Sequence, residues 1–355
     1  MNINNPDGHE EAPPAPLVEV RRGGLVESIH RGHVAAVDGE GRLVASLGDP
    51  DFVTYLRSSA KPLQALPLVT SAAADRFNFT TPELALACAS HSGQDLHAEL
   101  ARRMLTRIGL DERALKCGVH EPFDARTARR LRERGERPGA VRNNCSGKHA
   151  GMLALALHLG APHETYDHPD NPVQQAILQA VTQVSGVPRG EIHVGVDGCG
   201  VPVFALPVRA MALAYARLVA PPDSFDAPTR TACARLASAM TSHPELVGGT
   251  ISRFDTEMMR AAPGRVVSKV GAEGVYTAGV PPCDEWPKGL GLAFKVEDGE
   301  DRRARPVVAV EALRQLGVLD KNALNLLSPY STFPVQNHRG DFVGQIQHLF
   351  ELNMT

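Results

Sequence analysis

The sequence lacks the features of membrane, nucleic-acid-binding and disulfide-stabilised proteins. No stretch approaches the ~18 consecutive apolar residues that a membrane-spanning helix needs. The formal net charge is only −3, and no long basic run alternates with aromatic residues, so small solutes are better expected partners than nucleic acids. Six cysteines in 355 residues do not make a disulfide framework. Each cysteine is therefore expected to be core filler, a metal ligand or a reactive thiol.

The first residues, MNINNPDGHEEAPPAPL, are polar, acidic and rich in proline. They have neither the basic start nor the apolar centre of a signal peptide. We expect residues 1–16 to form a disordered tail and the protein to be cytoplasmic. Residues 17–355 contain no repeat or linker that would separate domains, and a hydrophobic content of 43% is enough for a large core. We therefore expect them to form a single domain.

Strand patterns lie at both ends of the chain and helical patterns between them. Two apolar runs flank Asp38-Gly39-Glu40-Gly41, and two more flank Arg339-Gly340-Asp341, which predicts two hairpins. Asn171 and Asp226 are candidate N-caps. The order predicts an α+β fold, in which an antiparallel sheet from the N- and C-terminal segments packs with a helical middle. Helical spacing is found in residues 81–93, 95–110, 147–161, 171–186, 226–247 and 305–317, and strand character in residues 265–280 and 289–299.

The stretch RSSAKPLQALP, residues 57–67, places Ser58 three positions before Lys61. Pro62 lacks an N–H and suits the first turn of a helix, so the helix is expected to begin at about Ser58 or Ser59. A buried neutral lysine one turn from a serine can accept the hydroxyl proton and activate a nucleophile. The alternative is an N-capping serine followed by a solvated lysine, and the motif by itself favours that alternative.

Two further stretches strengthen the Ser/Lys hypothesis. CASHSGQ places Ser90 and Ser92 in a small polar loop, and SKVGAEG places Lys269 on a strand before Gly271. A Ser-x-x-Lys helix, a serine-bearing loop and a Lys-x-Gly strand, in this order, resemble the three motifs of serine β-lactamases and penicillin-binding proteins. The strict Ser-Asp-Asn and Lys-Thr-Gly forms are absent. The resemblance therefore concerns the architecture and does not imply β-lactam substrates.

A second group of chemically active residues includes Cys145, Lys148 and His149, with Cys199 in a glycine-rich turn. Two thiolates and a nitrogen donor would suit zinc. Neither cysteine has a C-x-x-C partner, so spacing alone favours two separate buried cysteines. The Gly147-Lys148 pair lacks the upstream glycine and following Ser/Thr of a phosphate-binding loop, which excludes that motif.

Several long motifs in order resemble the rhizobial-type, or class 3, L-asparaginases, also called asparaginase II. They are RSSAKPLQALPLV, CASHSG, NNCSGKHAGMLA, HPDNPVQQAI, GVDGCGVPVFALP, KVGAEGV and WPKGLGLAFKVEDG. The resemblance covers nearly the whole chain after the tail. It implies a fold similar to serine β-lactamases and glutaminases, a homodimer, and hydrolysis of L-asparagine to L-aspartate and ammonia.

The resemblance also implies roles for individual residues. Ser58 would be the nucleophile and Lys61 its proton acceptor, with Ser90 and Lys269 as a second Ser/Lys pair. Matching positions in the family hold zinc through two cysteines and a lysine, here Cys145, Cys199 and Lys148. The matching substrate-pocket residues are Arg57, His149 and Asp197.

These pocket residues have chemistry that suits an amino acid. The arginine could fork onto the α-carboxylate of the substrate, and the aspartate could pair with its ammonium. Asp197 could equally form the VDGCG turn, and His149 could be a hydrogen-bonding residue on a helix side.

The expected reaction is a double displacement. Ser58 attacks the side-chain amide, backbone N–H groups hold the oxyanion, ammonia leaves, and water hydrolyses the aspartyl ester. Zinc is expected to orient substrate rather than to activate a water nucleophile. The alternatives are a glutaminase or another acyl-transfer enzyme of the same fold, or a non-catalytic zinc-stabilised amino-acid sensor.

Overall fold

The computed structural model describes residues 12–355, and within them nine strands form one antiparallel sheet. Seven strands follow the order β10-β11-β1-β2-β9-β8-β7, while β3 pairs with β2 and β12 pairs with β3. A second sheet has the order β4-β6-β5. The strands are β1 (Ala15–Arg22), β2 (Leu25–Asp38), β3 (Leu43–Leu47), β4 (Val53–Tyr55), β5 (His193–Val196), β6 (Pro202–Pro207), β7 (Val267–Val270), β8 (Val275–Val280), β9 (Leu290–Val296), β10 (Phe333–Gln336), β11 (Phe342–His348) and β12 (Asn353–Met354).

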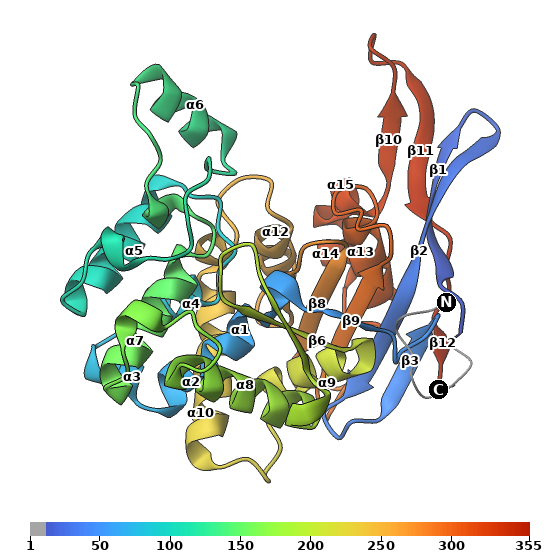
Figure 1. Cartoon of the computed structure of the whole chain (residues 1–355). Helices are drawn as coiled ribbons and strands as arrows, with labels where there is room; N and C mark the ends of the chain where they lie inside the picture. Colours follow the sequence, from blue (N-terminus) through green and yellow to red (C-terminus); the bar gives the residue numbers. More distant parts are fainter. Residues whose placement is uncertain (1–11) are drawn as a thin grey trace.

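The helices lie mainly between β4 and β7 in the chain, and Figure 1 shows them gathered beside the large sheet. Within residues 12–355 no helix is long and apolar enough to cross a membrane. The α-helices are α1 (Lys61–Gln64), α2 (Leu66–Thr70), α3 (Ala73–Arg76), α4 (Thr81–Ala87), α5 (Asp95–Arg107), α6 (Ala125–Glu133), α7 (Ser146–Leu159), α8 (Pro172–Ser185), α9 (Val208–Val219), α10 (Ala227–Ser242), α11 (Pro244–Val247), α12 (Phe254–Ala261), α13 (Arg305–Gln315), α14 (Lys321–Leu326) and α15 (Ser328–Ser331). The 3₁₀ turns are η1 (Arg57–Ala60), η2 (Glu112–Ala114), η3 (Ala140–Arg142), η4 (His163–Thr165) and η5 (Arg189–Glu191).

The central strands β8 and β9 of the large sheet, with the second half of β2, are buried on both faces. Successive side chains of a strand point to opposite faces, so Ala35 of β2 packs into one hydrophobic cluster and Ala36 into another. The first cluster includes α9 and the helical middle, while the second includes α13. Helices therefore cover both faces of the sheet, and the edge strand β7 borders the η1 turn.

The predicted α+β class, an antiparallel sheet packed with helices, is confirmed. The two predicted hairpins are β2–β3 and β10–β11. The N-cap predictions are also confirmed, because the side chain of Asn171 accepts from the Val173 N–H at 2.9 Å and that of Asp226 from the Thr229 N–H at 2.8 Å.

Other boundaries differ from expectation. Strand β1 begins at Ala15, two residues inside the predicted 1–16 tail, whereas residues 1–11 lie outside the described part of the chain. The helical pattern over 226–247 divides at His243, because Pro244 cannot continue the α10 hydrogen bonds and starts α11 instead. The small β4-β6-β5 sheet and helices α6, α9 and α12 were not expected.

Close packing of β9 against α9 depends on Gly291. A Cβ there would lie 1.8 Å from the Ala212 carbonyl oxygen and 2.7 Å from the Ala216 nitrogen, both backbone atoms of α9. We predict that Gly291→Ala lowers the free energy of unfolding by about 1–3 kcal/mol, because the helix must move away from the sheet. Urea denaturation measures this loss.

The matched control is Gly190→Ala, since a Cβ at that position meets nothing within 4 Å. Its free energy of unfolding should stay within about 0.5 kcal/mol of the parent value. Equal stabilities of the two variants would contradict the close packing of α9 on β9.

Candidate active site

Ser58 lies in the turn between β4 and α1. The predicted helix start at about Ser58 or Ser59 is corrected: a 3₁₀ turn covers Arg57–Ala60, and α1 begins at Lys61 with Pro62 in its first turn. Arg57 has a φ of 52°, which is uncommon for a residue with a side chain. Its Nε donates to Asp197 Oδ1 at 2.9 Å. This contact helps to hold the strained residue next to Ser58.

Ser58 and Ser90 belong to one hydrogen-bonded chain. Asn144 Nδ2 donates to Ser90 Oγ at 3.1 Å, and Ser90 Oγ donates to Ser58 Oγ at 3.4 Å. The two serines come from η1 and from the segment after α4, so the fold brings together the serines of two sequence motifs. A hydroxyl that accepts a hydrogen bond in this way has its developing negative charge stabilised when it loses its proton.

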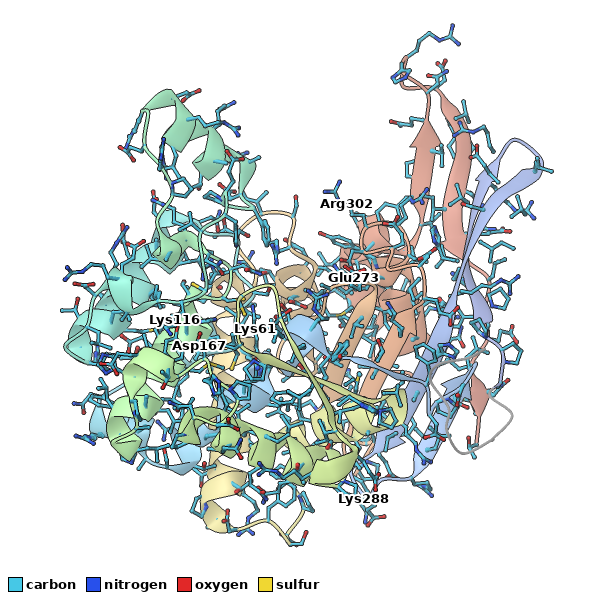
Figure 2. The ribbon with its side chains drawn as sticks, viewed as in Figure 1. Lys61, Lys116, Asp167, Glu273, Lys288 and Arg302 are labelled. Carbon is cyan, nitrogen blue, oxygen red and sulfur yellow. The ribbon has the colours of Figure 1, made fainter. Side chains whose placement is uncertain are left out.

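Lys61 is fully buried between the helical middle and the sheet, as Figure 2 shows. Its Nζ donates to the Asn144 carbonyl oxygen at 3.3 Å. The Lys61 backbone N–H donates to the Ser58 carbonyl oxygen, but within residues 12–355 no hydrogen bond joins the two side chains directly. The two residues are linked through Asn144 and Ser90, and catalytic contacts of this kind often tighten only when substrate binds.

Lys269 on β7 is also fully buried, and its main partner is a carboxylate. Its Nζ donates to Asp255 Oδ2 at 3.2 Å and to the Val270 carbonyl oxygen at 2.9 Å. Burial lowers the pKa of Lys269 to about 8, although the charge of Asp255 opposes the shift. No hydrogen bond within the described residues joins Lys269 to Ser90, so this predicted pair is not in direct contact.

Asp255 is held firmly in the same network. Its Oδ1 accepts hydrogen bonds from the Val270 N–H at 2.8 Å and from the Ser268 hydroxyl at 3.0 Å. The carboxylate is 1% exposed, so these donors and Lys269 supply the stabilisation that water would otherwise give.

Cys145, Lys148 and Cys199 meet at the start of α7. Lys148 Nζ donates to Cys199 Sγ at 3.0 Å. Hydrogen bonding from the Cys199 thiol holds the pKa of Cys145 well below its usual range, and the nearby lysines Lys61 and Lys148 add to this effect. A Cβ on Gly147 would lie 2.2 Å from the Leu86 carbonyl oxygen, so glycine lets α7 approach α4 and brings the cluster into place.

The remaining predicted residues border this thiol cluster. Asp197 Oδ2 accepts a long contact from Cys199 Sγ at 3.8 Å, in addition to its ion pair with Arg57. His149 Nδ1 lies 2.6 Å from the Tyr166 hydroxyl, while its buried Nε2 has no hydrogen-bond partner. Burial lowers the pKa of His149 to about 4, so the imidazole is neutral.

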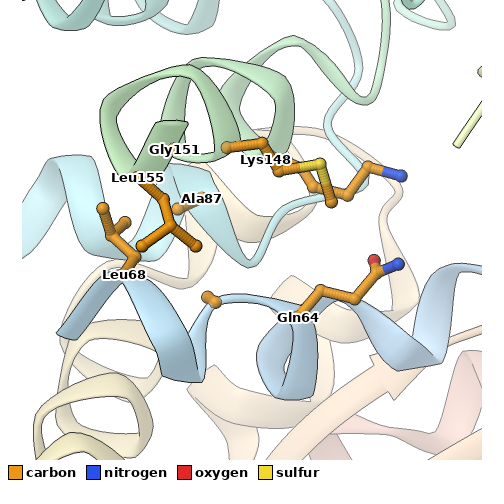
Figure 3. A pocket seen from close by; sticks show the side chains of 8 residues that line it. Gln64, Leu68, Ala87, Lys148, Gly151 and Leu155 are labelled. Carbon is orange, nitrogen blue, oxygen red and sulfur yellow. The ribbon is translucent and has the colours of Figure 1, made fainter. Parts of the chain in front are cut away.

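The cluster offers two thiols, an amine and a neutral imidazole nitrogen. This soft donor set fits zinc. Within residues 12–355 no three His, Cys, Asp or Glu side chains form a metal-binding group, so a site here depends on the lysine as a ligand. The Lys148 stem lines an enclosed cavity of about 10 Å³ with Leu68, Ala87 and Leu155, and Figure 3 shows its amine pointing away from these apolar side chains.

Ser58 and Ser90 line an open cavity of about 570 Å³. Its other walls come from Asn144, from the N-terminal end of α12, from the residues after β7 and from the start of α13. Arg57, Asp197 and the thiol cluster do not line this cavity. The two serines therefore lie between a substrate-sized space and a cluster of ionisable groups.

Three residues of the site were not predicted from the sequence. Asn144 connects Ser90 with Lys61, Asp255 pairs with Lys269, and Arg253 Nη2 donates to the Ser90 carbonyl oxygen at 2.6 Å. Asn144 lies inside the NNCSGKHAGMLA motif, so the sequence contained a signal that it belongs to the site. Arg253 and Asp255 lie outside all the motifs.

A family model described as L-asparaginase II matches residues 18–348. The comparison with curated proteins gives no match. Among solved structures, Mglu in its native form is 14% identical with a TM-score of 0.44, and the match covers 83% of this chain and 66% of that one. A Bacillus glutaminase is 13% identical with a TM-score of 0.36, covering 81% and 91% of the two chains. A probable glutaminase from Bacillus subtilis, complexed with 6-diazo-5-oxo-L-norleucine, is 12% identical with a TM-score of 0.35, covering 81% and 85%. At these TM-scores the structural similarity supports no conclusion about the function of this chain.

The Lys269–Asp255 pair makes a titration testable. We predict that Asp255→Asn lowers the pKa of Lys269 below its value of about 8, because the carboxylate charge that favours the ammonium is removed. NMR of ¹³Cε-labelled lysine, with the Lys269 signal assigned by Lys269→Met, follows the titration. The exposed Asp284→Asn change is the control and should leave the signal unchanged. An equal or higher pKa in Asp255→Asn would show that this carboxylate does not stabilise the charged lysine.

Proposed function

The chain belongs to the L-asparaginase II family, and on this premise we propose that it hydrolyses L-asparagine to L-aspartate and ammonia. Membership in this family supports an amidohydrolase role. The observation that carries the proposal is the position of Ser58. Within the matched region it faces an open cavity, accepts a hydrogen bond from Ser90, and lies near two buried lysines.

Ser58 is the proposed nucleophile. Its oxygen attacks the side-chain carbonyl carbon while its proton passes to a neutral lysine, and backbone N–H groups stabilise the oxyanion. The C–N bond then breaks, and ammonia leaves with the proton returned by the lysine. Water hydrolyses the resulting aspartyl ester by the same proton transfers in reverse, which regenerates Ser58.

Lys61 and Lys269 share the proton transfers in this proposal. Lys61 is assigned to Ser58, and Asn144 and Ser90 provide the connection between them. Lys269 is the proposed proton acceptor for Ser90, which requires its Nζ to leave its present partners Asp255 and Val270. Burial lowers the pKa of Lys269 to about 8, so its neutral, proton-accepting form is more accessible than that of an exposed lysine.

The charged pair beside Ser58 is the proposed recognition site for the α-groups of the amino acid. Arg57 uses Nε for Asp197 and its Nη1 lies 3.9 Å from Glu273 Oε1, so Nη2 is the proposed donor to the α-carboxylate of asparagine. Asp197 is the proposed partner of the α-ammonium. His149 is the third proposed residue of this recognition site, and burial lowers its pKa and keeps its imidazole neutral.

We also propose that Cys145, Cys199 and Lys148 hold a zinc ion. Bound there, zinc would supply a positive charge that orients substrate beside Ser58. The chain's own contribution is a buried set of two thiolates and one amine, and the amine must lose its proton before it can be a ligand.

Glutamine hydrolysis is the alternative activity within the same chemistry. A pocket that fixes the α-groups would place the amide carbon of glutamine one methylene beyond Ser58. A mismatch of one methylene costs about 1–3 kcal/mol, so asparagine should be preferred by at least about tenfold in kcat/KM. A non-catalytic amino-acid sensor would bind asparagine without releasing ammonia.

A coupled ammonia assay tests these possibilities. We predict turnover of asparagine, weaker turnover of glutamine, and loss of both in Ser58→Ala, because the nucleophilic oxygen is absent. Circular dichroism and zinc content serve as controls and should match the parent protein, since the Ser58 hydroxyl is not a metal ligand.

The possible results have separate meanings. Equal kcat/KM for the two amides would replace the asparaginase assignment with a broader amidohydrolase. Near-parental turnover in Ser58→Ala would exclude Ser58 as the nucleophile. Asparagine binding without ammonia release would support the sensor.

The zinc proposal predicts that Cys145→Ala or Cys199→Ala lowers bound zinc from stoichiometric to near zero. Each change removes one thiolate from a small ligand set. Cys233→Ala is the matched control, because this buried cysteine lies on α10 outside the cluster. Elemental analysis of dialysed protein measures the zinc. Full zinc content in either cluster variant would contradict this ligand set.

A further inference from the structure

The cavity next to Ser58 has a basic wall that the asparaginase proposal does not use. Arg253, Arg302 and Arg305 line it, opposed by Asp301 alone among acidic residues, so the lining carries a net charge of +2. Such a wall favours an anionic group on a ligand.

Two hydrogen-bond donors in this wall have no partner within the described residues. The Arg302 backbone N–H bonds Glu300 at 2.8 Å, but within residues 12–355 its guanidinium has no hydrogen-bond or ion-pair partner. Arg305 pairs with Asp301 and donates to the Gly271 carbonyl oxygen at 3.1 Å, yet its buried Nε has no hydrogen-bond partner. Figure 2 shows the Arg302 side chain projecting from the ribbon. The Arg302 guanidinium is exposed and can pair with a ligand carboxylate, whereas the Arg305 Nε is sealed from solvent and Arg305 contributes its charge.

The cavity is also larger than a free amino acid requires. Its volume of about 570 Å³ falls within the range of about 300–1,000 Å³ that encloses drug-sized ligands. Phe123, Tyr330 and Phe333 add aromatic surface to the lining. The space therefore suits a ligand with an apolar part as well as a negative charge.

The position of the cavity indicates which part of a substrate would occupy it. In the proposed function, which this step rests on, Arg57 and Asp197 bind the α-groups of the aspartyl part. These residues do not line the cavity, whereas Ser58 and Ser90 do. The nitrogen side of the scissile amide therefore faces the cavity.

We propose that the cavity binds the leaving group of an extended substrate, in which the side-chain carboxyl of aspartate forms an amide with a second amino acid. Arg302 binds the carboxylate of that second residue, and the aromatic lining contacts its side chain. Ser58 forms the aspartyl ester as the C–N bond breaks, the leaving amine takes the proton held by the lysine, and water releases aspartate. The products are aspartate and the second amino acid.

The test compares β-aspartyl-phenylalanine with its C-terminal amide, which has the same shape without the negative charge. Aspartate release by the purified protein is measured by chromatography. The acid should have a kcat/KM about tenfold to a hundredfold above that of the amide, because a charge-assisted hydrogen bond is lost in the amide. Arg302→Ala should remove this difference between acid and amide.

The adjacent Arg303→Ala is the matched control and should preserve the difference, since Arg303 pairs with Glu300 and does not line the cavity.

Ammonia release from asparagine is measured in parallel to separate the two proposals. Turnover of asparagine without cleavage of either dipeptide would overturn the extended substrate and leave the asparaginase proposal standing. Equal rates for acid and amide would overturn the role of the basic wall. A raised KM for asparagine in Arg302→Ala would show that the wall binds the carboxylate of asparagine itself, which overturns the placement of the leaving group. Cleavage of the dipeptide without turnover of asparagine would retain the cavity's role and reject the asparaginase proposal.

Discussion

Three lysine amines buried within one site impose the main physical constraint on this molecule. Lys61 and Lys269 have no exposed surface, and Lys148 is 4% exposed. A buried ammonium must be paired with an anion or lose its proton, because removal from water costs several kcal/mol for each charge. Lys269 pairs with the Asp255 carboxylate and Lys148 with the Cys199 sulfur, whereas Lys61 donates to a neutral acceptor, the Asn144 carbonyl oxygen. Each buried amine is thus tied to a polar group contributed by another segment of the chain.

The fold places these partners at the border between the sheet and the helical middle. Strand β7, at the edge of the sheet, carries Lys269, while α12 carries Asp255. Helix α7 carries Lys148 and packs against α4, whose end leads to Ser90. The reactive groups thus lie on rigid elements, although Ser58 itself is in a short turn. Pairing of Arg57 with Asp197 holds the residue before the serine in that turn.

Sequence patterns predicted the features that depend on local chemistry. Turn residues predicted both hairpins, and Asn171 and Asp226 predicted helix starts. These residues form their hydrogen bonds or turns with neighbours only a few positions away in the chain. Helix α9 was missed, although its sequence carries a helical pattern in which Arg209, Leu213 and Arg217 recur every four positions among buried residues.

In the candidate site, the family resemblance indicated Ser58, Ser90 and the thiol cluster, and the structure brings Ser58 near Ser90 and Cys199 near Lys148. It could not indicate Arg253 or Asp255, whose contacts with Ser90 and Lys269 exist only in the folded chain.

The order of strands has a consequence for how the chain folds during synthesis. Strand β1 lies between β2 and β11, and Val18 pairs with His348, 330 positions later. One edge of β1 therefore stays unpaired until almost the whole chain has left the ribosome. Contacts among α4, α5 and α7 span far fewer residues and can form earlier. The sheet is thus completed last, and until then the open β1 edge can pair with the strand of another chain.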